Sequence, residues 1–309
     1  MKLFITRHDK IGDFVVTLPL IKAIKEQYPQ THITVLVAKV NFEFAQNIEF
    51  IDEVMLYDKE DFWSMLKKVR IQKFDASISA FIDTRLGWLL FLSGIKKRVA
   101  PATKIAQIFF NAKVVQRRSQ VQKREWEYNL DLGKAIFPNL KLEFTKPLIS
   151  TTYHSPLTPH PRKVIFHAGF GGSSDGNLTL DDYINLACSI KNSEYEIVFS
   201  FGPDDEASKE YIQQHLDFEA TIFDSKVSLM EFTQYIANSI LFVSTSTGPM
   251  HLAGATNTQT LSFFGESLFA SAKRWGTMSD EEKQNNFCVP QNYGRDIYEN
   301  IEKRLKEVL

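Results

Sequence analysis

The sequence predicts an α/β protein built from two doubly wound, Rossmann-like domains. Short apolar runs alternate with longer amphipathic segments along the chain, which is typical of the β-α-β units of parallel sheets. The 309 residues are enough for two domains with separate hydrophobic cores. A proline-rich stretch, 151–161, separates two such alternating series. We therefore expect domains at 1–155 and 156–293 that face each other across a cleft, followed by a closing helix at 294–309.

The first series begins directly after the amino terminus. One helix, 14–27, is expected after the first strand because its apolar residues recur at helical spacing. The apolar stretch 86–95 contains Gly and Ser and is too short to cross a bilayer, so we interpret it as a buried helix. The expected strands are 3–6, 33–37, 53–56, 76–79 and 98–100.

The second series follows the proline-rich stretch. In open sheets of this type, ligands bind outside the carboxyl ends of the strands, so the loops after the strands are the candidate functional segments. The expected strands are 164–167, 196–200, 221–223, 240–243 and 260–264. Helices are expected to start near Leu180, Asp205, Leu229, Pro249 and Gly294.

The composition is that of a globular protein, with 44% hydrophobic and 24% charged residues. Two cysteines, Cys188 and Cys288, are too few for a disulfide framework and form no metal-binding motif, which favours a reducing cytoplasm. The chain passes from Met1 and Lys2 straight into an expected strand, so no signal peptide is expected.

Charge is divided unequally along the chain. Residues 1–150 hold 24 Lys and Arg against 16 Asp and Glu, whereas residues 151–309 hold 12 against 21. A basic first half favours an anionic partner, such as an anionic acceptor or an acidic membrane surface. Nucleic acid is not expected as a partner, because the basic runs lack the aromatic residues that nucleic-acid modules interleave with them.

The loop from Arg7 to Asp13 follows the first strand. It lacks the G-x-G-x-x-G fingerprint of dinucleotide-binding proteins. Gly12 allows a close approach to the backbone, and Asp13 lies where a helix begins. Two interpretations of Asp13 remain open: an aspartate that caps the helix, or a general base that points into the cleft.

The segment 243–253 joins an expected strand to an expected helix through hydroxyl side chains and a glycine. Free N–H groups at the start of a helix bind anions, so this junction is either a phosphate site or an ordinary capped turn. The glycine-rich segment 169–174 suits a phosphate cradle, although a flexible loop without a ligand is the competing interpretation. The adjacent carboxylates of 181–182 and 204–205 lie at expected helix starts and lack the spacing of metal ligands, so no metal is expected. A single helical histidine such as His251 is more often structural than a ligand.

Several of these segments resemble one known family. The residues 10–20 and the following Tyr28-Pro29 are similar to the opening of the ADP-heptose:lipopolysaccharide heptosyltransferases, glycosyltransferase family 9. Segment 243–253 resembles that family's signature, hydrophobic-S-x-D-T-G-x-x-H-x-A. The segment 169–174 resembles its glycine/serine loop, and Phe264-Gly265 resembles its L-F-G-x-T turn. These matches occur in the family's order and span nearly the whole chain.

The resemblance implies the GT-B architecture, in which the first domain binds the acceptor, the second binds the nucleotide-sugar, and the closing helix 294–309 crosses back to the first domain. It also implies inverting sugar transfer without a metal or cofactor. The donor would be a nucleotide-sugar, ADP-heptose, and the acceptor a lipopolysaccharide core or another surface-glycan precursor at the cytoplasmic face of the inner membrane. Asp13 would deprotonate the acceptor hydroxyl, with acceptor or phosphate contacts from Arg7, Lys10 and Gly12. The resemblance assigns donor binding to Gly171, Gly172, Ser173, Ser246, Thr247, Gly248, His251 and Glu266.

The chain departs from the family pattern at two places. Ser246 stands where the family has aspartate, and the segment 175–178 lacks the family's lysine and tryptophan. Loss of that cation would weaken binding of the leaving diphosphate unless Lys10, Arg7 or Arg274 replaces it. Two alternatives therefore stay open: a nucleotide-sugar epimerase of GT-B type, and a non-catalytic protein that binds nucleotide-sugars.

Overall fold

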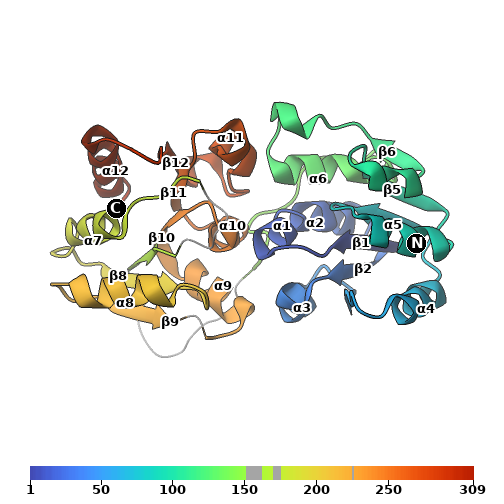
Figure 1. Ribbon diagram of the computed structural model, residues 1–309, viewed down its shortest axis with the longest axis horizontal. Coiled ribbons are helices and arrows are strands. Elements are labelled where there is room, and N and C mark those ends of the chain that lie inside the picture. The colour runs from blue at the N-terminus through green and yellow to red at the C-terminus, as the bar shows by residue number, and fades with distance from the viewer. Residues whose placement is uncertain (151–161, 170–174, 225) are drawn as a thin grey trace. The chain divides into compact units, whose positions relative to one another are not determined.

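The chain folds into two compact units, Met1–Leu148 and Ile149–Leu309, which we call the first and second unit. The computed structural model describes residues 1–150, 162–169, 175–224 and 226–309. The proline-rich stretch expected between the domains lies outside the described residues. Each unit contains one six-stranded parallel sheet with helices on both faces (Figure 1).

The sheet of the first unit has the order β3-β2-β1-β4-β5-β6, which is that of a doubly wound Rossmann-like sheet. The central strand β1 pairs with β2 on one side and with β4 on the other, so the winding reverses between β1 and β4. All five strands expected in this half are present, and β6 is added at the edge. The bounds are β1 Lys2–Arg7, β2 His32–Val37, β3 Glu53–Leu56, β4 Ala76–Ser79, β5 Lys97–Pro101 and β6 Ala112–Val114.

The expected helix 14–27 is wrong as a single element, because the chain forms α1 and then α2. Pro19, the second residue of α2, has no backbone N–H with which to continue the hydrogen-bond ladder from α1. The Thr17 hydroxyl instead donates to the carbonyl of Asp13 at 3.0 Å. The helices of this unit are α1 Ile11–Val15, α2 Leu18–Gln27, α3 Lys39–Gln46, α4 Phe62–Gln72, α5 Thr84–Leu92 and α6 Glu125–Gly133, with short 3₁₀ turns η1 Ile105–Phe109 and η2 Arg118–Gln120.

The apolar stretch 86–95 is helical as far as Leu92, but the expectation that it is buried holds for one face of α5 only. Leu86, Leu89 and Leu90 are buried, whereas Trp88 is 45% exposed and Phe91 is 50% exposed.

The sheet of the second unit has the order β12-β11-β10-β7-β8-β9 and therefore repeats the topology of the first, with its reversal between β7 and β10. The five strands expected here are present, and β12 is added at the edge. The strands are β7 Lys163–His167, β8 Glu196–Phe201, β9 Thr221–Asp224, β10 Ser239–Thr245, β11 Thr260–Phe264 and β12 Gln284–Cys288. The helices are α7 Leu180–Cys188, α8 Glu206–His215, α9 Leu229–Ala237, α10 Gly248–Ala255, α11 Ala272–Trp275 and α12 Arg295–Val308, with η3 Leu268–Ala270 and η4 Glu281–Lys283.

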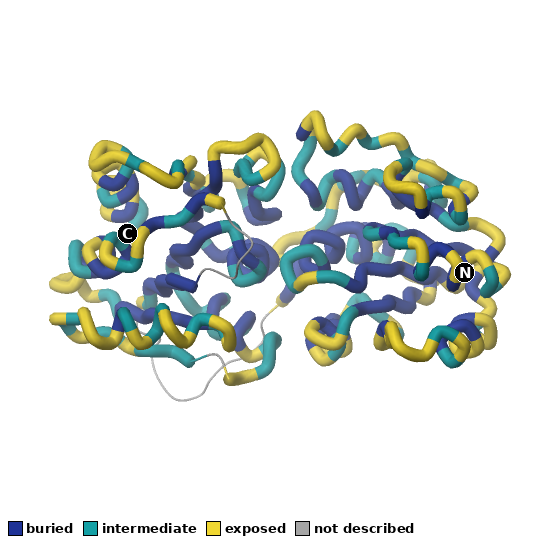
Figure 2. The backbone as a smooth tube through the Cα atoms, in the orientation of Figure 1, coloured by how far each residue is buried: buried dark blue, intermediate teal, exposed yellow. Residues whose placement is uncertain are grey.

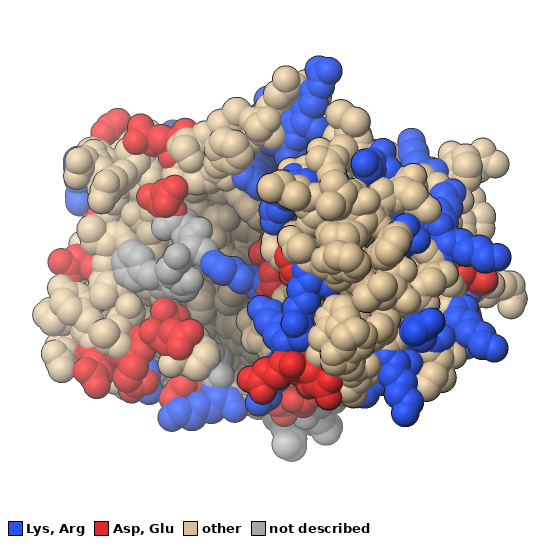
Figure 3. Space-filling view, turned by 45° about the vertical axis from the view of Figure 1, so that its right-hand side comes forward, with Lys and Arg blue, Asp and Glu red and all other residues tan. Residues whose placement is uncertain are grey.

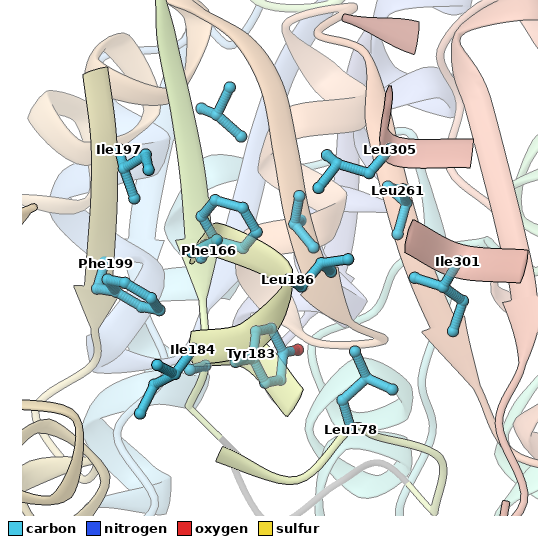
Figure 4. Packing of buried hydrophobic residues seen from close by; sticks show 14 of the residues in the cluster. Phe166, Leu178, Tyr183, Ile184, Leu186, Ile197, Phe199, Leu261, Ile301 and Leu305 are labelled. Atoms are coloured by element: carbon cyan, nitrogen blue, oxygen red, sulfur yellow. The ribbon is translucent and has the colours of Figure 1, made fainter. Parts of the chain in front are cut away.

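One face of the second sheet carries a hydrophobic core, part of which Figure 4 shows from close by. Phe166 and Phe199 from adjacent strands lie with ring centroids 5.5 Å apart. Ile301 and Leu305 of α12 are fully buried in the same core. The apolar face of α12 therefore packs within the second unit, and the crossing of 294–309 to the first domain stays a prediction. In Figure 2 the central strands of both sheets are dark and the outer faces of the helices are light, as expected for sheets covered by helices.

Candidate active site

Arg7, the last residue of β1, organises the loop that follows that strand. Its Nε donates to Asp9 Oδ1 at 2.8 Å, and its Nη2 donates to the carboxylate of Asp13. Nη1 donates to the carbonyl of Ala80, directly after β4, at 3.3 Å. The Arg7 side chain is 5% exposed, whereas that of Asp13 is 20% exposed. One buried guanidinium therefore joins both sides of the reversal point and leaves part of the Asp13 carboxylate accessible.

Burial and the neighbouring charges shift the pKa values of Arg7 and Asp9. Burial alone lowers the pKa of a guanidinium, but the charges of Asp9 and Asp13 outweigh it, so the pKa of Arg7 lies above its ordinary value. The pKa of Asp9 is raised by burial and by repulsion from Asp13, against the attraction of Arg7. Arg7 is thus a permanent cation between two carboxylates, a role that suits the planar guanidinium with its several N–H donors.

Asp13 does not cap α1. The N-cap is Lys10, whose side chain makes no capping hydrogen bond, and Asp13 is the third residue of the helix. The interpretation of Asp13 as a capping aspartate is therefore wrong. Lys10 is exposed and Gly12 is half-buried. Of the three residues expected to contact the acceptor or a phosphate, Arg7 is the one whose side chain is seen to bond to Asp13.

Polar residues of α6 and η2 support the junction between α1 and α2. Asn129 Nδ2 donates to the carbonyl of Val16 at 3.0 Å, and Arg118 Nη2 donates to Asn129 Oδ1 at 3.3 Å. Arg118 also forms an ion pair with the buried Glu125. Sequence reasoning missed this group because its members lie more than 100 residues from the junction that they support.

A second pair, formed by the buried His8 and the partly exposed Asp83, lies at the same end of the sheet. His8 Nε2 and Asp83 Oδ2 are 2.8 Å apart, and Asp83 also caps α5 by accepting from the N–H of Leu86 at 2.7 Å. Burial raises the pKa of Asp83, but the hydrogen bonds from His8 and Leu86 outweigh it, so its pKa is lowered. The His8 ring packs against Tyr57, with ring centroids 4.4 Å apart. Burial and the charge of Asp83 raise the pKa of Tyr57 to about 12.

In the second unit, the junction of β10 and α10 carries the candidate phosphate site. Thr247 is the N-cap of α10, but its side chain makes no capping hydrogen bond and donates to the carbonyl of Thr245 at 3.3 Å. The Ser246 N–H donates to Phe263 of the neighbouring strand at 3.0 Å. Gly248 begins the helix and Pro249 has no N–H. The junction is therefore not a turn capped by its own hydroxyl group.

The chain after the glycine-rich segment lies directly on the end of β11. A Cβ atom on Gly176 would lie 2.3 Å from the backbone of Phe264, and the Thr245 hydroxyl donates to the carbonyl of Gly176. The ends of β10 and β11 and the segment beginning at Asp175 therefore form one closely packed group. Gly171, Gly172 and Ser173, which were expected to bind the donor, lie outside the described residues.

The remaining expected donor-binding residues differ in their surroundings. His251 is buried in α10, and its ring centroid lies 6.0 Å from that of Trp275. Glu266 is exposed after β11. Arg274 stacks on Trp275, with its guanidinium carbon 4.9 Å from the ring centroid. A cation in the second unit is thus placed next to the aromatic ring that contacts α10.

The ends of β7 and β8 complete this edge. A Cβ atom on Gly169 would lie 2.0 Å from Asp205 Oδ2, and the same oxygen accepts from the N–H of Gly202 at 2.9 Å. His167 Nδ1 lies 3.0 Å from Ser200 Oγ, and burial lowers the pKa of His167 to about 4. Sequence reasoning did not select His167, whose burial depends on the assembled sheet.

Among the residues that the structure describes, no group of three or more His, Cys, Asp or Glu side chains could hold a metal ion. Within the same residues, no helix is long and apolar enough to cross a membrane.

Two Rossmann-like units, each with polar side chains where its strands end, have the GT-B fold. Residues 62–303 match the family model of glycosyltransferase family 9 (heptosyltransferase). The chain belongs to this family and is a glycosyltransferase.

Three proteins illustrate the relationship. A Haemophilus influenzae protein named only as a glycosyltransferase is 32% identical, over 97% of this chain and 92% of its own length. The lipooligosaccharide heptosyltransferase 2 of Campylobacter jejuni is 24% identical, over 89% of this chain and 85% of its own. The structure of Escherichia coli ADP-heptose lps heptosyltransferase II covers 100% of this chain and 98% of its own, with a TM-score of 0.82 and 16% identity. The last comparison shows a shared fold.

Proposed function

We propose that this protein transfers heptose from ADP-heptose to a lipopolysaccharide core or a related surface-glycan precursor, with inversion at the anomeric carbon. The names of its heptosyltransferase relatives support the sugar and the acceptor class. The observation that carries the mechanism is the Asp13 carboxylate, which is partly exposed and held by the buried Arg7 at the reversal point of the first sheet.

In the proposed reaction, Asp13 accepts the proton of an acceptor hydroxyl while that oxygen attacks the anomeric carbon of the donor. The bond between this carbon and the diphosphate oxygen breaks, and the nucleoside diphosphate leaves with the bonding electrons. Attack on the face opposite to the leaving group inverts the configuration. Arg7 holds one Asp13 oxygen, so the carboxylate is oriented before the acceptor arrives.

The diphosphate is proposed to bind at the start of α10, where the Thr247 side chain makes no capping hydrogen bond. We assign this role to Thr247 and Gly248, assisted by Gly171, Gly172 and Ser173, with Ser246, His251 and Glu266 around the rest of the donor. Arg274 is our candidate for the cation that the family places after the glycine/serine loop. Arg7 is engaged by two carboxylates, which leaves it less suited to that role.

We further propose that transfer needs no metal or other cofactor, so an excess of EDTA leaves the rate unchanged. We also propose that the reaction takes place at the cytoplasmic face of the inner membrane. We also assign acceptor binding to the domain 1–155 and donor binding to the domain 156–293.

Replacing Asp13 tests the mechanism. Asp13→Asn keeps the size of the side chain but removes the base, so transfer is expected to fall by about 10²–10⁴-fold. Calorimetric affinity for ADP-heptose is expected to stay unchanged. Asp61→Asn, at the N-cap of α4, is the matched control and should retain full activity.

Full transfer activity in Asp13→Asn would remove Asp13 from the mechanism. Conversion of the donor in the absence of any acceptor would indicate an epimerase instead. Failure to bind any nucleotide-sugar among ADP, GDP, UDP and CDP donors would contradict both enzymatic alternatives.

A further inference from the structure

The surface formed by α5 and η1 in the first unit is apolar and exposed. Trp88 and Phe91 occupy the outer face of α5, and on η1 Ile105 is 82% exposed and Ile108 is 66% exposed. Residues three apart in a 3₁₀ turn lie on one side of it, so the two isoleucines share a face. We call Trp88, Phe91, Ile105, Ile108 and Phe109 the apolar patch. Contiguous exposed apolar groups of this kind mark interaction sites more often than isolated ones do.

The patch is a preformed part of the fold. The Phe109 ring lies 4.8 Å from that of Trp88 and 6.4 Å from that of Phe91, measured between centroids. A Cβ atom on Gly87 would lie 2.5 Å from the Phe109 ring, so this glycine lets η1 pack directly on the backbone of α5. Arg98 Nε donates to the carbonyl of Phe109 at 2.8 Å.

Positive charge is concentrated in the same part of the chain. Residues 62–124 hold 14 Lys and Arg, 2 Asp and no Glu, whereas the rest of the first unit holds 10 Lys and Arg against 14 Asp and Glu. The net positive charge of this unit therefore comes entirely from the stretch that contains α4, α5 and η1. Figure 3 shows many Lys and Arg side chains among uncharged ones over the first unit.

Exposed lysines adjoin the patch. Lys96 and Lys97 follow α5, and the side chain of Asn111 donates to the carbonyl of Lys96 at 2.7 Å, which ties this turn to the end of η1. Lys113 is in register with Ala100, which is buried beneath α5 and η1. Because paired residues of neighbouring strands point to the same face of a sheet, Lys113 lies on the face that carries the patch.

We propose that the apolar patch and its lysines dock the protein on an anionic lipid bilayer, with Trp88, Phe91, Ile105 and Ile108 entering the interface. Aromatic and aliphatic side chains enter the boundary between headgroups and acyl chains, while surrounding lysines pair with anionic headgroups. This charge complementarity favours a membrane over a second copy of the chain, whose patch would carry the same positive charge. The inference extends the proposed function, since a docked enzyme would meet a lipid-linked acceptor at the bilayer.

Sedimentation with vesicles tests the proposal on the full-length protein. Binding is measured to vesicles of phosphatidylcholine alone and of phosphatidylcholine with phosphatidylglycerol, without donor or acceptor. The wild type is expected to bind the anionic vesicles, and less so at high salt. Lys96→Gln/Lys97→Gln/Lys113→Gln and Ile105→Ser/Ile108→Ser are each expected to reduce this binding by about tenfold or more.

Two sets of controls accompany these variants. Lys59→Gln/Lys134→Gln/Lys141→Gln removes the same charge from exposed positions outside 62–124, and Val40→Ser removes an exposed apolar side chain from α3. Both should bind vesicles as the wild type does. All variants should transfer sugar to a water-soluble, deacylated acceptor at the wild-type rate, so a failure of docking is distinguishable from a failure of the proposed chemistry.

Equal binding to neutral and anionic vesicles would overturn the proposal, and so would unchanged binding by the triple lysine variant and the double isoleucine variant. So would a wild-type dimer in sedimentation velocity that the isoleucine variant abolishes, because the patch would then be covered by a second copy.

Discussion

At the scale of single residues, Arg7 shows how a short motif acquires its geometry. A buried guanidinium requires partners, and the chain supplies carboxylates two and six residues later, at Asp9 and Asp13. Removing the positive charge would leave two nearby carboxylates in a poorly hydrated place. The spacing of arginine and aspartates in this loop is therefore a structural requirement as well as the basis of the proposed chemistry.

His167 carries a prediction about stability and pH. Burial lowers its pKa from 6.5 to about 4, so between these values the unfolded chain binds a proton that the folded chain does not. The stabilisation that depends on neutral His167 is fully present above the unfolded pKa of 6.5 and is lost as the pH falls from 6.5 towards 4. Replacement by Gln removes the effect, so the loss of unfolding free energy from pH 7.5 to pH 5 is expected to be smaller in His167→Gln by about 2 kcal/mol.

Urea unfolding at the two pH values measures this difference. His215→Gln, at an exposed histidine of α8, is the control and should keep the wild-type dependence on pH. Parallel loss of stability in His167→Gln and wild type would show that His167 binds its proton equally well in the folded chain.

At the scale of elements, buried strands were predictable because parallel strands covered on both faces are continuous apolar runs. The edge strands β6 and β12 were missed. β12 has the sequence QNNFC, whose polar residues face solvent or make side-chain hydrogen bonds, such as that from Asn285 Nδ2 to the Thr260 carbonyl at 2.9 Å. The division between α1 and α2 was also missed, since apolar spacing continues through it and the support from Asn129 comes from a distant segment.

The segment after the glycine-rich stretch gives the prediction at this scale. Because Gly176 has no room for a Cβ atom beside Phe264, Gly176→Ala must move this segment away from β11. Overpacking of this kind typically destabilises a protein by about 1–3 kcal/mol. We expect a lower melting temperature and weaker binding of ADP-heptose in calorimetry.

Gly94→Ala is the control for this substitution. Gly94 has a φ of +82°, and a Cβ atom there would meet no other atom within 4 Å, so alanine introduces backbone strain without a clash. It should lower the melting temperature without changing donor affinity. Unchanged donor affinity in Gly176→Ala would separate this segment from the donor site.

At the scale of the whole molecule, the sequence was sufficient to predict two doubly wound units, because strands and helices alternate in the same way in both halves of the chain. It also placed Asp13 and Thr247 after strands, and each of these strands borders a reversal point. It could not supply the pairing of His8 with Asp83, which are 75 residues apart, nor the hydrogen bond from Asn129 to Val16, which are 113 residues apart. Those contacts depend on strand order, which local patterns do not encode.

The division of the chain into two compact units leads to a prediction about which unit the nucleotide stabilises. A ligand stabilises the part of a protein that binds it, by about 2.7 kcal/mol at a hundred times its Kd. If the diphosphate binds at the end of β10, ADP should slow amide exchange in α10 and at the end of β11, where the chain from Asp175 packs. Exchange in α1 and α2 should not change with ADP alone.

Hydrogen exchange followed by mass spectrometry measures both regions in one sample, and Asp13→Asn should show the same protection as the wild type. Protection confined to α1 and α2 would instead assign the nucleotide to the first unit and reverse the proposed roles of the two domains.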